Sequence, residues 1–183
     1  MTPDTPDTVK TPPSPWVARF APLISGKILD IAAGAGRHTR YFLDRGHRVT
    51  AVDRDLSRMA DLRDTAKLEM RQTDLEAGAG QLPEGLFGGV IVTNYLWRPL
   101  LPAIVAAVAE DGVLLYETFA TGNAAYGKPS NPDYLLQPGE LLDAVDGQLQ
   151  VVAYENGVID DPRPAVIQRI CAIRRSVVDI RLS

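Results

Sequence analysis

The stretch ILDIAAGAGRHTRYFLDRGHRVTAVDRD (28–55) passes from an apolar run through a loop of small residues into a helical segment and a second apolar run. The first run, within 26–32, is typical of a buried strand. Residues 37–46 predict a helix that ends at Gly46, because glycine readily adopts the left-handed conformation of a helix C-terminus. The segment 47–53 predicts the second strand. This order of strand, loop, helix and strand is typical of one unit of a parallel sheet.

The rest of the chain continues the alternation. Further strands are expected at 67–74, 85–95, 112–120, 149–159 and 165–174, and helices at 16–24, 55–66, 98–110 and 138–145. Strands that alternate with helices predict a parallel sheet covered on both faces. Only residues 160–164 separate the last two strands, too few for a helical crossover, so these strands are expected to form an antiparallel hairpin. The sequence therefore predicts an α/β fold with a mostly parallel sheet that ends in one antiparallel strand.

Length and composition indicate a single domain. A chain of 183 residues that is 45% hydrophobic and 23% charged can bury one core but is short for two. The first fifteen residues contain five prolines among small polar residues, a composition that resists both helix and sheet. We therefore expect residues 1–15 to form a flexible proline-rich arm and residues 16–183 to form the domain.

Charge and the scarcity of cysteine and histidine narrow the function classes. A formal net charge of −4 does not favour a phosphate backbone, so nucleic acid is not the expected partner. The single cysteine, Cys171, excludes an internal disulfide, and two histidines add little to a metal site, so no bound metal and a reducing, cytoplasmic location are expected. No apolar run approaches the length of a membrane span, so no membrane contact is expected.

The loop of small residues at 32–36 is the candidate ligand site. In an open parallel sheet, ligands bind at the carboxyl ends of the strands. Alanine and glycine leave room for a ligand there, and the amides that begin the next helix point towards it. Asp53 ends the second strand, in position for a carboxylate that accepts hydrogen bonds from two ribose hydroxyls. These features fit an adenosine compound, and a nicotinamide dinucleotide fits them equally well.

Three residues separate the two ligand types. The dinucleotide fingerprint G-x-G-x-x-G, read from Gly34, requires a glycine where this chain has Thr39. Asp30 precedes the loop, and its carboxylate opposes a diphosphate but suits a ligand with ammonium and sulfonium charges. Asp74, at the end of the third strand, is placed to accept a hydrogen bond from an adenine amino group. These residues favour S-adenosylmethionine over NAD.

Taken in order, five segments resemble a known family: LDIAAGAGRHT, VTAVDRD, RQTDLE, VTNYLWRPLLPAI and GVLLYETFA. They resemble the class I S-adenosylmethionine-dependent methyltransferases, and within them the small bacterial enzymes related to the tellurite-resistance type, over roughly residues 26–175. The resemblance implies a Rossmann-like, doubly wound, seven-stranded, mostly parallel sheet with an antiparallel C-terminal strand and helices on both faces. It also implies S-adenosylmethionine as the cofactor and S-adenosylhomocysteine as the product.

By position, the resemblance also implies cofactor-binding residues. These are Asp30, Ala32, Gly34 and Gly36 at the methionine and ribose part, Asp53 at the ribose hydroxyls, Asp74 and Leu75 along the adenine, and Asn94 after the fourth strand. Each has a structural alternative. Short acidic side chains often bond local backbone amides, so Asp30 could instead cap the turn that follows it.

No single catalytic residue is identified. Methyl transfer from a sulfonium is an in-line displacement, in which the protein chiefly aligns the reactants and excludes water. The candidates that follow strands four and five are Asn94, Tyr95, Trp97, Arg98 and Glu117, with Thr118 and Phe119 beside them. Aromatic rings could hold the sulfonium or the substrate, and Arg98 could orient an anionic substrate. Packing against the core and solvent exposure remain the alternatives for these residues.

The long segment 121–140 is a candidate substrate lid. Loops of this length in compact domains are usually functional or disordered, and this one carries Tyr126, Lys128, Asn131 and Tyr134. The overall prediction is a methyltransferase that acts on a small-molecule acceptor, and a tellurite or selenite oxyanion enters only through family analogy. An NAD-dependent oxidoreductase and a non-catalytic module that binds an adenosyl ligand remain the alternatives, and no oligomeric state is predicted.

Overall fold

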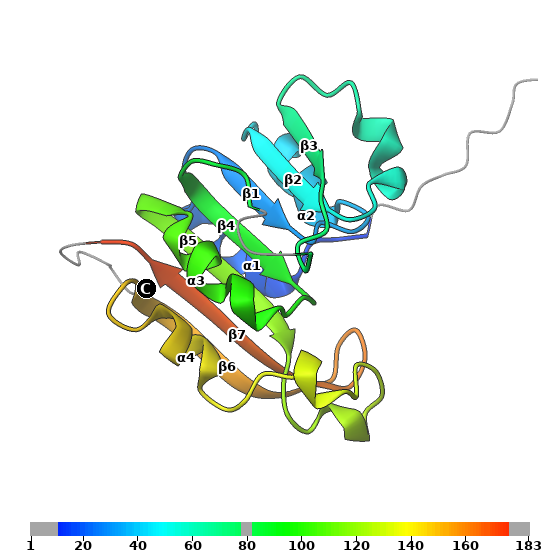
Figure 1. Cartoon of the computed structure of the whole chain (residues 1–183), viewed down its shortest axis with the longest axis vertical. Coiled ribbons are helices and arrows are strands. Elements are labelled where there is room, and N and C mark those ends of the chain that lie inside the picture. Colours follow the sequence, from blue (N-terminus) through cyan, green and yellow to red (C-terminus); the bar gives the residue numbers. More distant parts are fainter. Residues whose placement is uncertain (1–10, 78–81, 176–183) are drawn as a thin grey trace, which may run out of the picture.

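Seven strands form one sheet in the order β3-β2-β1-β4-β5-β7-β6 (Figure 1). The computed structural model describes residues 11–77 and 82–175. The strands are β1 Ile28–Ile31, β2 Val49–Asp53, β3 Leu68–Gln72, β4 Phe87–Thr93, β5 Val108–Phe119, β6 Gln150–Ile159 and β7 Ala165–Ile173. Strands β1 to β5 pair in parallel, and β7 runs antiparallel to both β5 and β6. The predicted α/β, Rossmann-like sheet with one antiparallel strand is confirmed.

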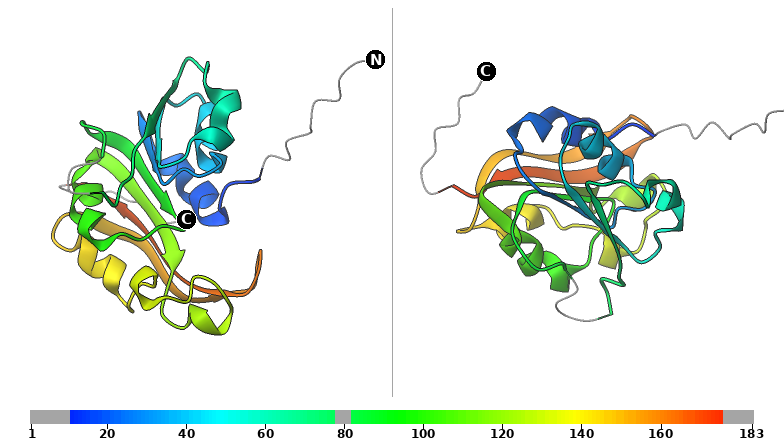
Figure 2. Two further views of the ribbon diagram at one scale, coloured as in Figure 1. Left: turned by 45° about the vertical axis from the view of Figure 1, so that its right-hand side comes forward. Right: turned by 90° about the horizontal axis from the view of Figure 1, so that it is seen from above.

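Helices cover both faces of this sheet. They are α1 Pro15–Phe20, α2 Arg37–Asp44, α3 Leu101–Ala106 and α4 Glu140–Val145, with the 3₁₀ helices η1 Ala21–Leu23, η2 Ser57–Leu62, η3 Arg98–Leu100, η4 Asn123–Ala125 and η5 Pro132–Tyr134. Apolar residues of α1 and α2 share one buried cluster, and those of α3 and α4 share another. In the right-hand view of Figure 2, α1 (blue) lies on one side of the sheet and α3 (green) and α4 (yellow) on the other.

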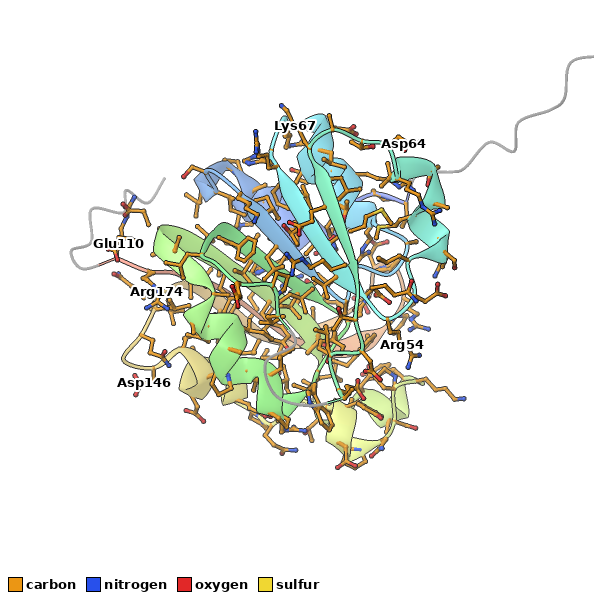
Figure 3. The ribbon with its side chains drawn as sticks, turned by 45° about the horizontal axis from the view of Figure 1, so that its top comes forward. Arg54, Asp64, Lys67, Glu110, Asp146 and Arg174 are labelled. Carbon is orange, nitrogen blue, oxygen red and sulfur yellow. The ribbon has the colours of Figure 1, made fainter. Side chains whose placement is uncertain are left out.

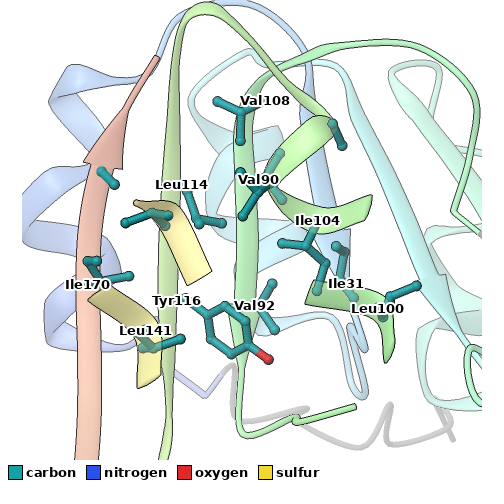
Figure 4. Close-up of a cluster of buried hydrophobic side chains, with 14 of the residues drawn as sticks. Ile31, Val90, Val92, Leu100, Ile104, Val108, Leu114, Tyr116, Leu141 and Ile170 are labelled. Atoms are coloured by element: carbon teal, nitrogen blue, oxygen red, sulfur yellow. The ribbon is translucent and has the colours of Figure 1, made fainter. Parts of the chain in front are cut away.

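The central strands are apolar on both sides because each side meets a helical layer. All four residues of β1 are buried. Leu29 and Ile31 belong to the cluster of α3 and α4, whereas Ile28 belongs to that of α1 and α2. Figure 4 shows the cluster of α3 and α4, in which Ile104 of α3 and Leu141 of α4 pack against the sheet. Since side chains alternate along a strand, the side chain of Asp30 shares the face of Ile28.

The helix predicted at 98–110 is wrong in its last four residues. The helical turns end at Ala106, and β5 already begins at Val108, which pairs with Phe87. The apolar run of alanine and valine fits helix and strand alike, and pairing with β4 decides between them. A register shift allows Gly89 to pair with Val113.

The helix predicted at 55–66 is a short 3₁₀ helix, η2, with non-helical dihedral angles at Met59. The apolar residues Leu56, Met59 and Leu62 are spaced by three, which matches the three residues per turn of a 3₁₀ helix better than an α-helix. Leu56 and Met59 are buried, as expected for the inner side of this element.

The beginning of the described chain extends the domain slightly towards the predicted arm. Ser14 is buried and caps α1, because its Oγ accepts hydrogen bonds from the amides of Trp16 (3.1 Å) and Val17 (3.4 Å). Pro15 occupies the first turn of the helix, where a missing N–H costs nothing. Residues 1–10 lie outside the described residues, so the arm itself stays a prediction. Within the part of the chain that is described, no helix combines the length and hydrophobicity that crossing a bilayer requires.

Candidate active site

A cavity of about 550 Å³ opens at the carboxyl ends of the parallel strands. It is lined by Ala32, Asp53, Arg54, Thr73, Asp74, Leu75, Glu76, Asn94, Tyr95, Leu96, Thr118, Phe119, Pro129 and Tyr134. In Figure 3, Arg54 marks this end of the sheet, and Lys67, which precedes β3, marks the opposite end. The volume lies within the roughly 300–1,000 Å³ typical of cofactor and small-molecule pockets. This is the edge at which open α/β sheets bind ligands.

Asp53 connects the loop of small residues to the cavity. It is the last residue of β2, and its Oδ2 accepts a hydrogen bond from the Gly34 amide at 2.8 Å. Its Oδ1 accepts one from the Asp55 amide at 2.9 Å. A carboxylate offers about four acceptor sites, so each oxygen keeps capacity for a ligand donor such as a hydroxyl.

Gly36 keeps this loop close to the neighbouring layer. Its φ of +75° is left-handed, and a Cβ at this position would collide with the Met59 sulfur and lie 2.8 Å from the Met59 Cγ. Any other residue would therefore be strained in its backbone and would force the buried Met59 side chain to shift. The glycine predicted as a cofactor residue does not itself line the cavity, and its observed contacts explain it as a packing requirement.

Asp30 lies beneath the loop rather than on the cavity wall. It is buried on the α2 side of β1, and the Thr39 hydroxyl donates to its Oδ2 at 2.6 Å. Burial raises the pKa of Asp30 to about 6, although hydrogen bonds from Thr39 and the nearby charge of Arg37 oppose this shift. The observed contact corresponds to the capping alternative, since it ties β1 to the first turn of α2.

His38, which precedes Thr39 in α2, is also buried and binds the residue that caps α1. Its Nε2 accepts the Ser14 amide at 3.1 Å, so the proton sits on Nδ1, which lies 3.4 Å from the Thr93 hydroxyl. Burial, aided by the charge of Arg37, lowers the pKa of His38 to about 3. His38 is therefore a neutral structural residue at neutral pH.

The structure brings together about half of the candidate residues. The candidates that line the cavity are Ala32, Asp53, Asp74, Leu75, Asn94, Tyr95, Thr118, Phe119 and Tyr134. Those that do not line it are Asp30, Gly34, Gly36, Trp97, Arg98 and Glu117. Sequence reasoning did not select Arg54, Thr73, Glu76, Leu96 and Pro129, which also line it. Each of the five adjoins a selected residue in the sequence. The available signal was position after a strand end for four of them and position in the loop 121–140 for Pro129.

Glu117 and Trp97 have other partners. The Glu117 carboxylate accepts a hydrogen bond from Arg169 Nη1 at 3.2 Å, and the same guanidinium binds Glu155. Glu117 therefore faces the α1 side of β5, whereas Thr118, the next residue, faces the cavity. Trp97 is partly buried against the cluster of α3 and α4.

Arg98 holds the loop 121–140 against the body of the protein. Its Nε and Nη2 donate to the two carboxylate oxygens of Glu140 at 2.6 and 3.0 Å. Its Nη1 and Nη2 also donate to the carbonyl oxygens of Asp133 (2.7 Å) and Leu135 (2.9 Å). We call this set of bonds the Arg98 clasp. The clasp fixes the segment that carries Tyr134. It also engages the Arg98 guanidinium, which the sequence suggested as a group that orients an anionic substrate.

Tyr95 and Asn94 form the middle of the cavity. The Tyr95 hydroxyl is buried and has no hydrogen-bond partner among the described residues. Burial raises the pKa of this phenol, and the charges of Glu76 and Asp74 raise it further, so Tyr95 stays protonated. Asn94 has a left-handed φ of +55°, a conformation that costs energy and occurs preferentially at functional sites.

The charged lining of the cavity is mostly acidic. Asp53, Asp74 and Glu76 face it together with one cation, Arg54. Such a site stabilises a ligand with positive charge and opposes a diphosphate. No group of three or more His, Cys, Asp or Glu side chains suited to a metal ion occurs within residues 11–77 and 82–175.

Comparison with known proteins agrees with this geometry. Residues 28–111 match the family model of the methyltransferase domain. The chain is 31% identical over 148 residues to the ribosomal RNA small subunit methyltransferase H of Gemmatimonas aurantiaca, covering 81% of this chain and 46% of that protein. This chain thus spans about half the length of that curated relative.

Solved structures share the fold. TehB from Haemophilus influenzae superposes with a TM-score of 0.69 at 18% identity, over 86% of this chain and 61% of TehB. The 1,6-didemethyltoxoflavin-N1-methyltransferase of Burkholderia thailandensis, crystallised with its substrate and S-adenosylhomocysteine, gives a TM-score of 0.66 at 23% identity, over 89% and 78% of the two chains. The resemblance to class I methyltransferases predicted from the sequence is confirmed in the domain and in the fold.

Proposed function

Because residues 28–111 carry the methyltransferase domain within the class I S-adenosylmethionine-dependent fold, we propose that the chain transfers the methyl group of S-adenosylmethionine to a small-molecule acceptor. The observation that carries this proposal is Asp53, at the end of β2. Two backbone amides hold its carboxylate at the cavity wall, and its remaining acceptor capacity suits the two hydroxyls of a ribose.

The neighbouring strand ends supply the other cofactor contacts in this proposal. Asp74 accepts a hydrogen bond from the adenine amino group, and the buried Leu75 contacts the ring. Ala32 and Asn94 line the cavity between the ends of β1 and β4, where the methionine part then lies. The acidic lining offsets the positive sulfonium and ammonium groups of the cofactor.

The chemistry requires little beyond alignment. A lone pair of the acceptor attacks the methyl carbon, the bond between sulfur and this carbon breaks, and sulfur leaves as the neutral thioether of S-adenosylhomocysteine. A proton lost by the acceptor passes to solvent or to a carboxylate of the cavity. In this proposal the cavity, partly covered by the loop 121–140, orients the acceptor behind the methyl group. Tyr95 does not act as a base in this proposal, because its phenol stays protonated.

Two other ligands are less well supported. A dinucleotide would bring its diphosphate to the acidic cavity, and Thr39, where the fingerprint has its third glycine, is already bonded to Asp30. RNA is suggested by the name of the ribosomal RNA relative. The net charge of −4 and a cavity partly covered by the loop 121–140 favour a small acceptor.

Titration calorimetry tests the cofactor. S-adenosylmethionine and S-adenosylhomocysteine are expected to bind the purified chain, whereas NAD is not. Transfer of a labelled methyl group to any acceptor then separates an enzyme from a non-catalytic module. Binding of NAD with no binding of either adenosyl compound would refute the proposal.

Two wider features also remain proposals. We propose a cytoplasmic location, supported by the presence of a single cysteine in the sequence, which is buried. The division into an arm at 1–15 and a domain at 16–183 is supported by the proline content of the first segment. Limited proteolysis followed by mass spectrometry of the stable fragment tests that division.

A further inference from the structure

The cavity has two unlike sides. The order of the sheet places the ends of β2 and β3 on one side, the ends of β1 and β4 in the middle, and the end of β5 on the other side. In the proposed function, the adenosine part occupies the side of β2 and β3. We define the acceptor wall as the lining residues from β5 and the following loop, namely Thr118, Phe119, Pro129 and Tyr134.

We propose that the acceptor wall binds a ring-bearing methyl acceptor that carries no negative charge, and that oxyanions and carboxylates are rejected. This inference rests on the proposed function and specifies its substrate class. It differs from the oxyanion acceptor that analogy with the tellurite-resistance type suggests.

The absence of a basic residue from the acceptor wall supports the first part of this inference. Among the described residues that line the whole cavity, Arg54 is the one cation, and it extends from the end of β2, on the adenosine side. Three carboxylates line the same space: Asp53, Asp74 and Glu76. An anionic acceptor would therefore enter a site with excess negative charge and meet no guanidinium or ammonium on its own wall.

The nearby basic residues Arg98, Lys128 and Arg163 do not line the cavity. Arg98 makes four hydrogen bonds, to both oxygens of Glu140 and to two backbone carbonyls of the loop. Lys128 is exposed and does not line the cavity, although its neighbour Pro129 does. Arg163 contacts the Lys128 carbonyl oxygen at 3.5 Å. The Arg98 clasp therefore shapes the acceptor wall and leaves it uncharged.

The side chains that remain on the wall suit a ring. Tyr134 contributes an aromatic residue and Pro129 an apolar one, and Phe119 at the end of β5 also lines the cavity. Tyr134 is 45% exposed, so part of its ring remains available for contact with a ligand. Aromatic faces bind flat rings and organic cations well and do not compensate an anion. The aromatic and apolar lining and the absence of a cation from the wall thus both favour an uncharged or cationic ring compound.

Three probes with one ring and different charges test the inference. They are p-cresol (neutral), tyramine (cationic) and 4-hydroxyphenylacetate (anionic), with sodium selenite as an oxyanion. Calorimetry measures their binding to the full chain saturated with S-adenosylhomocysteine, and methyl transfer is measured with labelled S-adenosylmethionine. We expect p-cresol and tyramine to bind about tenfold or more tightly than 4-hydroxyphenylacetate, and selenite neither to bind nor to be methylated.

Variants link the result to the wall. Tyr134→Ala is expected to weaken the binding of p-cresol and tyramine alike and to leave the affinity for S-adenosylhomocysteine unchanged. Glu76→Gln is expected to reduce the discrimination against 4-hydroxyphenylacetate. Asp64→Asn is the matched control for the charge change, because Asp64 lies towards the end of the sheet opposite Arg54 (Figure 3). It is expected to change neither the affinity for the probes nor the discrimination among them.

The outcomes separate this inference from the proposed function. If S-adenosylhomocysteine does not bind, the proposed function fails and the inference fails with it. If it binds but 4-hydroxyphenylacetate or selenite equals the uncharged and cationic probes, in affinity or in methylation, only the inference is overturned. Absence of binding by all three ring probes, with S-adenosylhomocysteine bound, overturns it as well.

Discussion

Replacing Asp53 with alanine should weaken cofactor binding while the protein stays folded. In the proposed function, this carboxylate accepts hydrogen bonds from two ribose hydroxyls. Hydrogen bonds to a charged group contribute about 1.5–3 kcal/mol. Their loss corresponds to a dissociation constant for S-adenosylhomocysteine that rises roughly 10- to 150-fold.

The same substitution also removes two internal hydrogen bonds, from the amides of Gly34 and Asp55. Each contributes roughly 1 kcal/mol in a partly exposed loop, so the free energy of unfolding should fall by about 1–3 kcal/mol. A folded protein with weakened binding is therefore the expected state of Asp53→Ala. Circular dichroism and a urea titration measure that stability independently of ligand.

Calorimetry with S-adenosylhomocysteine is the assay. The matched control is Asp64→Ala, towards the end of the sheet opposite Arg54 (Figure 3). Asp53→Asn is a useful intermediate, because its amide oxygen can still accept one hydrogen bond but carries no charge. Asp53→Ala that binds as tightly as the parent would refute the placement of the ribose. An equal loss in Asp64→Ala would show that the effect is not local to the site.

Three further substitutions test other parts of the structure. Arg98→Gln should release the loop 121–140, because charge-assisted hydrogen bonds of about 1.5–3 kcal/mol are lost, and hydrogen exchange of the loop's backbone amides should accelerate by about tenfold or more. Arg175→Gln, which removes a surface ion pair, should leave this exchange unchanged. Equal exchange rates in the two variants would argue against the Arg98 clasp. Gly36→Ala should lower the free energy of unfolding by about 2–4 kcal/mol, since it combines left-handed backbone strain with overpacking. Gly147 also has a positive φ, but no atom lies within 4 Å of an added Cβ. Gly147→Ala should therefore lower the free energy of unfolding by the backbone strain alone, roughly 1 kcal/mol. Asp30 binds its proton more tightly in the folded state, with a pKa raised from 3.8 to about 6. Relative to Asp30→Asn, the parent should therefore lose roughly 3 kcal/mol of stability as the pH rises from about 3 to about 7. Urea titrations across this range should show no such divergence if the carboxyl is accessible to solvent.

The parts of the site that the sequence predicts are those that are encoded locally. The run of apolar residues in β1, the small residues after it and Asp53 at the end of β2 lie within one short stretch, and parallel pairing brings the ends of the strands together. No knowledge of the rest of the chain is needed to expect a ligand there. The same reasoning applies to Asp74 at the end of β3.

The roles of Arg98 and Glu117 depend on distant residues. The partners of Arg98 lie 35 to 42 residues further along the chain, and Arg169, the partner of Glu117, lies 52 residues further. The alternation of side chains along β5 implies that Glu117 and Thr118 face opposite sides. Sequence alone did not show which side faces the ligand, because both sides of this strand are covered by helices.

Thr39 links the geometry of the loop to the choice of ligand. In the dinucleotide fingerprint, the third glycine lets helix and strand pack closely. Here Thr39 is fully buried and donates to Asp30, so a hydroxyl and a carboxyl fill the space between α2 and β1. The pair anchors the first turn of α2 to the sheet without a glycine. The residue that departs from the dinucleotide pattern is therefore part of the support of the loop, and replacing it with glycine would remove that support rather than create a dinucleotide site.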